Sequence, residues 1–153
     1  MSEQWRSEIE ELIVEFAFFA DGGCHAKLVT LFTSDGSFII PDLPLQSGKV
    51  IVYRGHDQLR GRWGGAVAHA TCHIMSLPRL RRNGVETASG VINMISYRGA
   101  VQGFSPAHEP FIVGRFEDRY SVENGRWLIA ERRLVVTFAG AALREPVGVR
   151  PEH

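Results

Sequence analysis

The chain has 153 residues, 44% of them hydrophobic and 22% charged, and its 17 basic side chains balance 17 acidic ones. A domain of this length can bury a core without metals or disulfides. The zero net charge argues against nucleic acid as a partner, because a nucleic-acid binder presents a basic surface to the phosphates.

The sequence lacks the marks of secretion and of membrane insertion. No charged N-terminal segment leads into an apolar stretch, and no run approaches roughly 18 uninterrupted apolar residues. Cys24 and Cys72 form no closely spaced pair, so two reduced thiols are the simplest expectation. We therefore expect a cytoplasmic protein with no membrane partner.

The first part of the chain is predicted to be mostly helical. Apolar residues recur every three or four positions between Trp5 and Phe19, which indicates one face of an amphipathic helix that ends at Gly22-Gly23. A further helix, a strand, a second strand and a third helix are expected, in that order, over residues 24–32, 38–40, 50–53 and 55–63.

The second half of the chain is predicted to be a run of strands over residues 68–80, 85–97, 111–122 and 126–138. Asn83-Gly84 and Asn124-Gly125 stand at two of the joints, and Asn-Gly favours the positive φ angles of tight hairpin turns. Helices followed by an antiparallel meander predict an α+β fold whose sheet curls over the helices. Residues 1–138 would form this domain, and residues 139–153 a tail or an arm on a neighbouring subunit.

Three blocks of the sequence resemble a known family in order and spacing. The first joins Ala20-Asp21 to Leu31-Phe32 and ends at Phe38, the second is Tyr53-Arg54-Gly55, and the third comprises residues 114–120 and 124–133. They resemble a SnoaL-like member of the NTF2-like superfamily, which includes scytalone dehydratase and ketosteroid isomerase. The resemblance covers about residues 5–138 and implies a cone, in which a curved antiparallel sheet wraps around the N-terminal helices.

The resemblance also implies a catalytic pair, Asp21 and His73. In dehydratases of this superfamily an aspartate near the end of the first helix orients a histidine on a central strand, and these two residues hold the matching positions. A histidine can remove a proton beside a carbonyl and return it to a leaving hydroxyl, while the carboxylate fixes its tautomer. The alternatives are structural: Asp21 could bind the amides of Gly22-Gly23, and His73 could be an ordinary hydrogen-bonded histidine.

The wall of the expected pocket is predicted from side chains near this pair. A small-molecule site is mostly apolar with a few placed polar groups, and each candidate can equally be a plain core residue. Asn93 could donate to a substrate carbonyl or be satisfied by solvent. The candidates are Phe38, Tyr53, Trp63, Met75, Asn93 and Phe116.

Two charged segments of the closing hairpin are predicted to form cross-strand ion pairs on the outer face of the sheet, with a structural role. They are Glu117-Asp118-Arg119 and Glu131-Arg132-Arg133. His69 and His73 lie four residues apart on one predicted strand, about 13 Å at the usual rise, so they cannot share a metal ion. Neither a metal nor a cofactor is expected.

The first functional hypothesis is a cofactor-independent lyase or isomerase that acts on a small hydrophobic carbonyl compound, with His73 as general acid and base. The second is a non-catalytic protein, either a small-molecule binder or a structural module like the β subunit of ring-hydroxylating dioxygenases. Ala20 and Phe38 stand where scytalone dehydratase-like sites have tyrosines, and Leu77 stands where they have an asparagine, which argues against scytalone as the substrate. A homodimer or homotrimer is the expected assembly.

Overall fold

The structure is a computed structural model that describes residues 3–65, 69–99, 104 and 109–144. The helices are α1 (Gln4–Asp21), α2 (His25–Val29), α3 (Gly55–Trp63) and α4 (Ala141–Arg144), with a 3-10 turn, η1, at Leu45–Ser47. The strands are β1 (Phe32–Pro41), β2 (Val50–Arg54), β3 (Ala70–Met75), β4 (Arg79–Arg82), β5 (Thr87–Gly99), β6 (Ile112–Glu123) and β7 (Arg126–Ala139).

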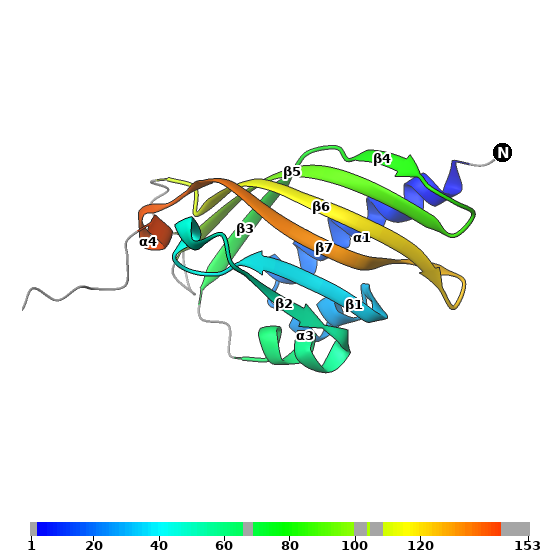
Figure 1. Ribbon diagram of the computed structural model, residues 1–153, viewed down its shortest axis with the longest axis horizontal. Coiled ribbons are helices and arrows are strands. Elements are labelled where there is room, and N and C mark those ends of the chain that lie inside the picture. The colour runs from blue at the N-terminus through cyan, green and yellow to red at the C-terminus, as the bar shows by residue number, and fades with distance from the viewer. Residues whose placement is uncertain (1–2, 66–68, 100–103, 105–108, 145–153) are drawn as a thin grey trace, which may run out of the picture.

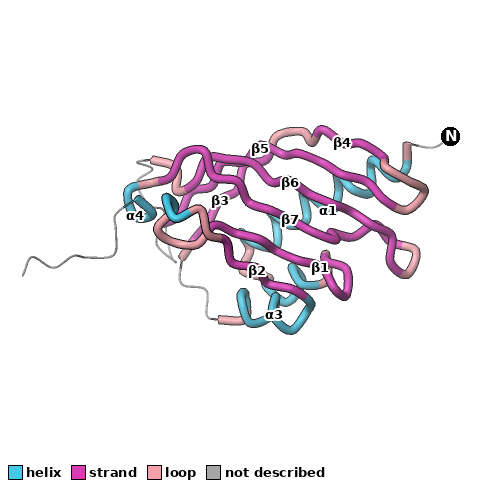
Figure 2. The backbone as a smooth tube through the Cα atoms, viewed as in Figure 1, coloured by secondary structure: helices cyan, strands magenta, loops and turns pink. Residues whose placement is uncertain are grey.

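The strands form one seven-stranded sheet in the order β2-β1-β7-β6-β5-β3, with β4 paired to β5 beyond this path. The sheet curves over α1, and α3 lies against β1 and β2 (Figure 1). Figure 2 shows the same layers by element type, with the magenta strands lying over the cyan helix α1. The predicted α+β class, helices first and a curved sheet afterwards, is confirmed.

Helix α1 forms where the apolar periodicity predicts it. Its buried residues recur at helical spacing and face the sheet, whereas Val14 and Phe18 on the other side are 65% and 71% exposed. The helix ends at Gly22, and Gly23 follows with a φ of 68°, a conformation that glycine adopts without steric cost. The buried residues are Ile9, Leu12, Ile13 and Phe16.

An aromatic cluster fills the space between α1, α3 and the sheet. The Phe16 ring lies at the centre, with its centroid between 5.8 and 6.4 Å from those of the other four rings. Each large buried side chain contributes about 1.5–3 kcal/mol by leaving water, so this cluster fixes the helices to the sheet. The aromatic cluster consists of Phe16, Phe32, Phe38, Trp63 and Phe116.

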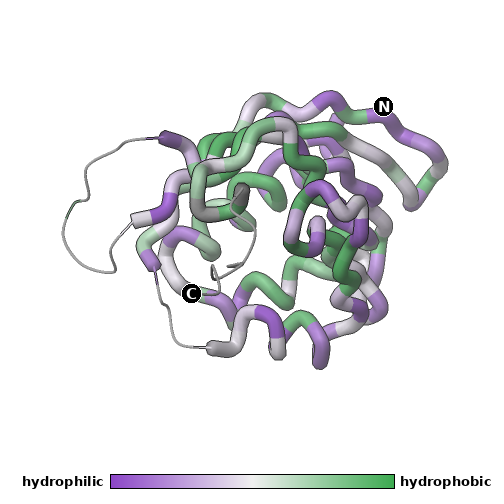
Figure 3. The backbone as a smooth tube through the Cα atoms, turned by 60° about the vertical axis from the view of Figure 1, so that its left-hand side comes forward, coloured by the Kyte–Doolittle hydropathy of each residue, from purple (hydrophilic) through white to green (hydrophobic). Residues whose placement is uncertain are grey.

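Residues of β5 alternate in burial along its length, so one face of the sheet is turned to α1 and the other to solvent. We call these the inner and the outer face. Figure 3 shows apolar stretches, in green, in many parts of the backbone rather than gathered in one segment. On β5 the inner face carries Ala88, Gly90, Ile92, Met94 and Ser96, all buried.

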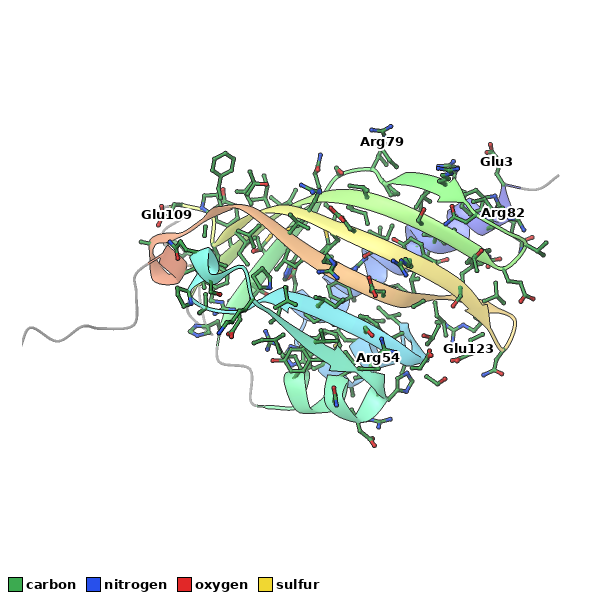
Figure 4. The ribbon with its side chains drawn as sticks, in the orientation of Figure 1. Glu3, Arg54, Arg79, Arg82, Glu109 and Glu123 are labelled. Carbon is green, nitrogen blue, oxygen red and sulfur yellow. The ribbon has the colours of Figure 1, made fainter. Side chains whose placement is uncertain are left out.

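The first strand is longer than predicted, and its partner runs in the same direction. Only residues 38–40 were expected, but β1 starts at Phe32 and pairs in parallel with β7, with a register shift between Phe32 and Ser37. A Cβ on Gly36 would lie 2.9 Å from the carbonyl oxygen of Ile129, so glycine allows the two strands to approach. Glu123, labelled in Figure 4 at the end of β6, accepts hydrogen bonds from Ser34 N and Oγ at 2.7–3.1 Å and secures this irregular segment.

The predicted strand over residues 68–80 is wrong as a single element. It is broken between β3 and β4, because Pro78 supplies no N–H for a sheet ladder and Leu77 is 89% exposed. Both pieces pair with the long strand β5. At the break Ser76 N donates to Asn93 O and Asn93 N donates to Ser76 Oγ, which keeps the junction attached to β5.

The two Asn-Gly joints behave differently. Asn124 and Gly125 have φ angles of 51° and 74° and form the two-residue turn between β6 and β7 that the sequence predicts. Asn83 and Gly84 lack positive φ angles; they belong to a longer loop in which both amides donate to Thr87 O. That hairpin forms, but the predicted turn type is wrong.

The predicted tail begins where β7 ends, and its first described residues form the short helix α4. Ala141 N donates to the Glu109 carboxylate at 2.8 Å, and Figure 4 shows Glu109 beside this helix. Residues 145–153 lie outside the described part of the chain. Within the described residues, no helix is long and apolar enough to cross a membrane.

Candidate active site

The last residue of α1 and a residue of β3 meet at one end of the inner face. Asp21 lies there because Gly22 and Gly23 stop the helix directly after it. On β3, Thr71, His73 and Met75 are less exposed than the residues between them, so their side chains share the inner face. The helix end therefore faces the predicted histidine.

Three hydrogen bonds hold the Asp21 carboxylate against β3. Its Oδ1 lies 2.6 Å from His73 Nδ1 and accepts from Thr71 Oγ1 at 3.0 Å, while Oδ2 accepts from the backbone N–H of His73 at 2.9 Å. Both oxygens are thus occupied, and the carboxylate is fixed to the strand that carries the imidazole. The alternative in which Asp21 binds the Gly22-Gly23 amides is wrong, since those amides donate to the carbonyls of Phe18 and Ala20.

This arrangement determines which nitrogen of His73 is free. A carboxylate only accepts, so Nδ1 must carry the proton that it donates to Asp21. Nε2 is then the unprotonated nitrogen of the neutral ring, and it makes no hydrogen bond to the described residues. The His73 side chain is 18% exposed and that of Asp21 28%, so both side chains are partly accessible to solvent.

Five of the six predicted wall residues lie on the inner side of the sheet. Phe38 and Phe116 are buried members of the aromatic cluster. Tyr53 pairs with Phe38 across β1 and β2 and stays half-buried, as do Trp63 and Met75. His25 Nδ1 donates to Trp63 O at 2.7 Å and joins α2 to the end of α3.

Asn93 was expected beside the pair and lies elsewhere. Its neighbours Ile92 and Met94 are buried on the inner face, so alternation along β5 directs the Asn93 side chain outward. There it lines a groove of about 450 Å³ on the outer face, which also includes Ile74, Ile95 and Phe138. The assignment of Asn93 to the pocket wall is therefore wrong, because the register could not be fixed from sequence.

A second ion pair, between Asp118 and Arg132, lies deep in the core. The sequence had predicted that both residues form ion pairs on the outer face of the sheet. Arg132 is fully buried, and its Nε and Nη2 donate to Asp118 at 2.9 and 2.6 Å. Tyr120 Oη donates to the same carboxylate at 2.5 Å. The prediction is wrong for Asp118 and Arg132, which point inward; Glu117, Arg119, Glu131 and Arg133 line a groove on the other face.

The guanidinium of Arg132 lies between two aromatic rings, with its central carbon 4.2 Å from the Phe16 centroid and 4.5 Å from that of Phe116. Burial acts to lower the pKa of Arg132, but the charge and hydrogen bonds of Asp118 outweigh it and raise the pKa above its ordinary value. Nη1 is buried without a hydrogen-bond partner in the described part of the chain. The planar fork directs this nitrogen away from Asp118, so its N–H groups can donate to another oxygen.

The other histidine and cysteine side chains considered as functional groups do not cluster. His69, expected at a rim or in solvent, is exposed just before β3. Cys24 and Cys72 are free thiols, and both are exposed. Among residues 3–65, 69–99, 104 and 109–144, no group of three or more His, Cys, Asp and Glu side chains could hold a metal ion.

The chain matches known proteins in sequence and in structure. Residues 4–133 match the SnoaL-like domain. Among curated proteins, no sequence matches the chain significantly. A candidate scytalone dehydratase from Novosphingobium aromaticivorans is similar in structure, with a TM-score of 0.73, 16% identity, and coverage of 96% of this chain and 95% of that one.

Two further solved structures show how varied the similar proteins are. The β subunit of a candidate aromatic-ring-hydroxylating dioxygenase from Novosphingobium aromaticivorans has a TM-score of 0.73 and 14% identity, over 90% of this chain and 92% of that one. Hexachlorocyclohexane dehydrochlorinase LinA-type3 from Novosphingobium barchaimii has a TM-score of 0.69 and 14% identity, over 87% and 86%. At such identities the likeness establishes the NTF2-like fold alone. With the match across residues 4–133, the chain belongs to the family of SnoaL-like domains.

Proposed function

We propose that this protein is a cofactor-independent lyase or isomerase that acts on a small apolar carbonyl compound. The observation that supports it most is the 2.6 Å contact between Asp21 Oδ1 and His73 Nδ1, made while Oδ2 holds the backbone N–H of His73. A carboxylate fixed in this way orients the imidazole and leaves Nε2 as a base.

In the proposed reaction Nε2 of His73 removes a proton from the carbon beside the carbonyl. The electron pair of the broken C–H bond forms an enolate, and Asp21 stabilises the imidazolium. The proton then passes from Nε2 either to a hydroxyl on the next carbon, which leaves as water, or to a different carbon of the substrate. The first route is a dehydration and the second an isomerisation, and neither consumes a co-reactant.

The enolate oxygen needs a donor, and the tyrosines typical of scytalone dehydratase-like sites are replaced here by Ala20 and Phe38. In our proposal this role falls to Arg132, whose buried Nη1 has N–H groups unused by the described residues. A preorganised donor of this kind is worth about 2.7–4 kcal/mol of transition-state stabilisation. Sequence reasoning missed it because Arg132 lies among charged residues on a strand, and only its register turns it inward.

The experiment is a proton-exchange and elimination assay in deuterium oxide. α-Tetralone reports exchange beside a carbonyl by NMR, and β-hydroxybutyrophenone reports loss of water by ultraviolet absorbance. We expect the natural protein to catalyse at least one reaction, and His73→Ala and Asp21→Asn each to lower the rate by about 10²–10⁴-fold. His69→Ala, which removes an exposed histidine just before β3, serves as the matched control and should keep the natural rate.

Full activity in both His73→Ala and Asp21→Asn would rule this mechanism out. A non-catalytic role is the second candidate, and the outer groove favours it, because Phe138 and Ile74 there are 67% and 53% exposed. A structural subunit would use such a surface to bind a larger partner. Co-purification with an iron-containing subunit, abolished by Phe138→Asp, would support that role.

A further inference from the structure

Arg98 lies on the inner face beside the Asp21–His73 pair. It is directly opposite Thr71 in the pairing of β5 with β3, and residues directly opposite one another in a sheet share a face. The Thr71 hydroxyl donates to Asp21, so its side chain is on the inner face. Arg98 therefore stands next to the catalytic end of the strand, one position beyond His73 and Ser96 on that face.

The guanidinium of Arg98 is held in place without an acidic partner. Its central carbon lies 4.0 Å from the ring centroid of Phe111, a stacking contact that orients the planar group. The nearby Asp21 carboxylate already accepts three hydrogen bonds from Thr71 and His73. Within the described residues no carboxylate pairs with Arg98.

Arg62 lies on α3 next to Trp63, whose carbonyl oxygen accepts from His25 Nδ1 at 2.7 Å, four residues after Asp21. Its guanidinium carbon lies 5.9 Å from the ring centroid of Tyr53, one of the half-buried residues of the inner face. Two residues earlier on the same helix, Arg60 pairs with Asp57 at 2.9 Å, whereas Arg62 has no carboxylate partner in the described part of the chain. Of these two arginines, Arg60 is paired with a carboxylate, whereas Arg62 is not paired with one among the described residues.

The positive charge of Arg62 acts on Arg98. Burial lowers the pKa of Arg98, and the positive charge of Arg62 lowers it further. Two like charges near one another repel, although solvent screens part of that repulsion because both side chains are exposed. An anion bound between them would relieve this repulsion.

We propose that the substrate carries a carboxylate, and that Arg62 and Arg98 bind it at the open end of the cone. The inference rests on the proposed function, since it specifies the substrate class of the same site. Arg98 offers a planar fork that matches both oxygens of a carboxylate, and Arg62 adds a second charge. The apolar body of the acid would then extend toward Trp63 and the aromatic cluster and present its reacting carbon to His73.

The test compares two ligands that differ in charge and match in shape. β-Naphthoate and β-naphthamide are titrated into the full chain by isothermal calorimetry at low and high sodium chloride. We expect the acid to bind at least about ten-fold more tightly than the amide at low salt, and the difference to shrink at high salt. Equal affinity for the two compounds would overturn the proposal.

Substitutions of Arg62 and Arg98 test whether these two side chains cause the preference for the acid. Arg98→Met and Arg62→Met should each weaken β-naphthoate by about five-fold or more and leave β-naphthamide unchanged. Arg60→Met removes the same charge from the opposite side of α3 and should change neither affinity by more than about two-fold. A loss in Arg60→Met equal to that in Arg62→Met would mean a bulk charge effect and would contradict the site.

Two further variants, Arg98→Lys and Asp21→Asn, separate loss of folding and loss of catalysis from loss of carboxylate binding. If Arg98→Met does not fold, Arg98→Lys retains the charge without the fork and should show an intermediate loss of β-naphthoate affinity. Binding needs no turnover, so Asp21→Asn should still prefer the acid even where catalysis is lost. A preference for the acid in a protein without turnover would count against the proposed catalysis alone, and turnover of carbonyl compounds without that preference would count against the carboxylate alone.

Discussion

Two aspartates in this protein each bind a basic side chain, one in the core and one near the surface. Asp118 and Arg132 lie in the core with side chains fully removed from solvent, and Tyr120 completes their hydrogen bonding. Asp21 and His73 lie at one end of the inner face, with 28% and 18% of their side chains exposed. Both pairs are joined by a contact of 2.6 Å, so distance alone does not separate them.

The two pairs differ in the kind of basic side chain, guanidinium or imidazole, and in its exposure to solvent. The guanidinium of Arg132 stays protonated at any ordinary pH, and its pair with Asp118 is fixed charge inside the core. The imidazole of His73 has a donor and an acceptor nitrogen and is partly exposed to solvent. The deep pair is thus a buried structural ion pair, whereas the shallow pair has the partial exposure that the proposed chemistry requires.

The largest expected effect comes from breaking the deep pair. Asp118→Ala leaves the Arg132 charge buried and unpaired, and such a change costs about 3–5 kcal/mol of unfolding free energy. Urea denaturation followed by tryptophan fluorescence measures the loss. The triple variant Asp118→Leu, Arg132→Met and Tyr120→Phe removes every polar member and should recover most of that stability; equal instability of both proteins would show that packing, not charge, is responsible.

A smaller effect is expected at the tyrosine of the deep pair, and it depends on pH. Burial, followed by the charge of Asp118, raises the pKa of Tyr120 well above the ordinary tyrosine value of about 10. A raised folded-state pKa contributes stability that is complete below pH 10 and is lost as the pH rises above it. Tyr120→Phe should cost about 1.5–3 kcal/mol near pH 8 and clearly less near pH 11. A constant difference between the two proteins would contradict the shift.

The smallest effect on stability is expected at the shallow pair. Asp21→Asn should change the unfolding free energy by less than about 1 kcal/mol, because the pair is partly solvated and an amide oxygen can still accept from the strand. The same variant should lose nearly all turnover in the assay described above. A destabilisation as large as that of Asp118→Ala would place Asp21 in the architecture and remove the contrast between the pairs.

The sequence predicted the strongly patterned parts of the fold and one contact of the site. Helix α1, the strands β5 to β7 and the turn at Asn124-Gly125 follow from periodicity and turn chemistry. The contact between Asp21 and His73 was predicted by position matching to a family and agrees with the hydrogen bonding. Its catalytic role stays a prediction.

Two of the misses share one physical cause, the face of the sheet to which a side chain points. Asn93 and Arg132 were assigned to the wrong faces, because a shift of one residue in register reverses every side chain of a strand. The parallel pairing of β1 with β7 was missed for another reason, since it joins segments far apart in the chain. Local patterns do not encode such pairings.

The parallel pairing of β1 with β7 also bears on the order in which the protein folds. Strands β5, β6 and β7 are joined by neighbouring connections, whereas β1 must wait for the last strand to be available before it can dock. Contacts between distant segments form slowly, because the chain loses loop entropy before it gains them. The pairing of Asp21 with His73 spans 52 residues, so we expect this contact to be among the late events, and a partly folded chain would have a nearly complete meander without it.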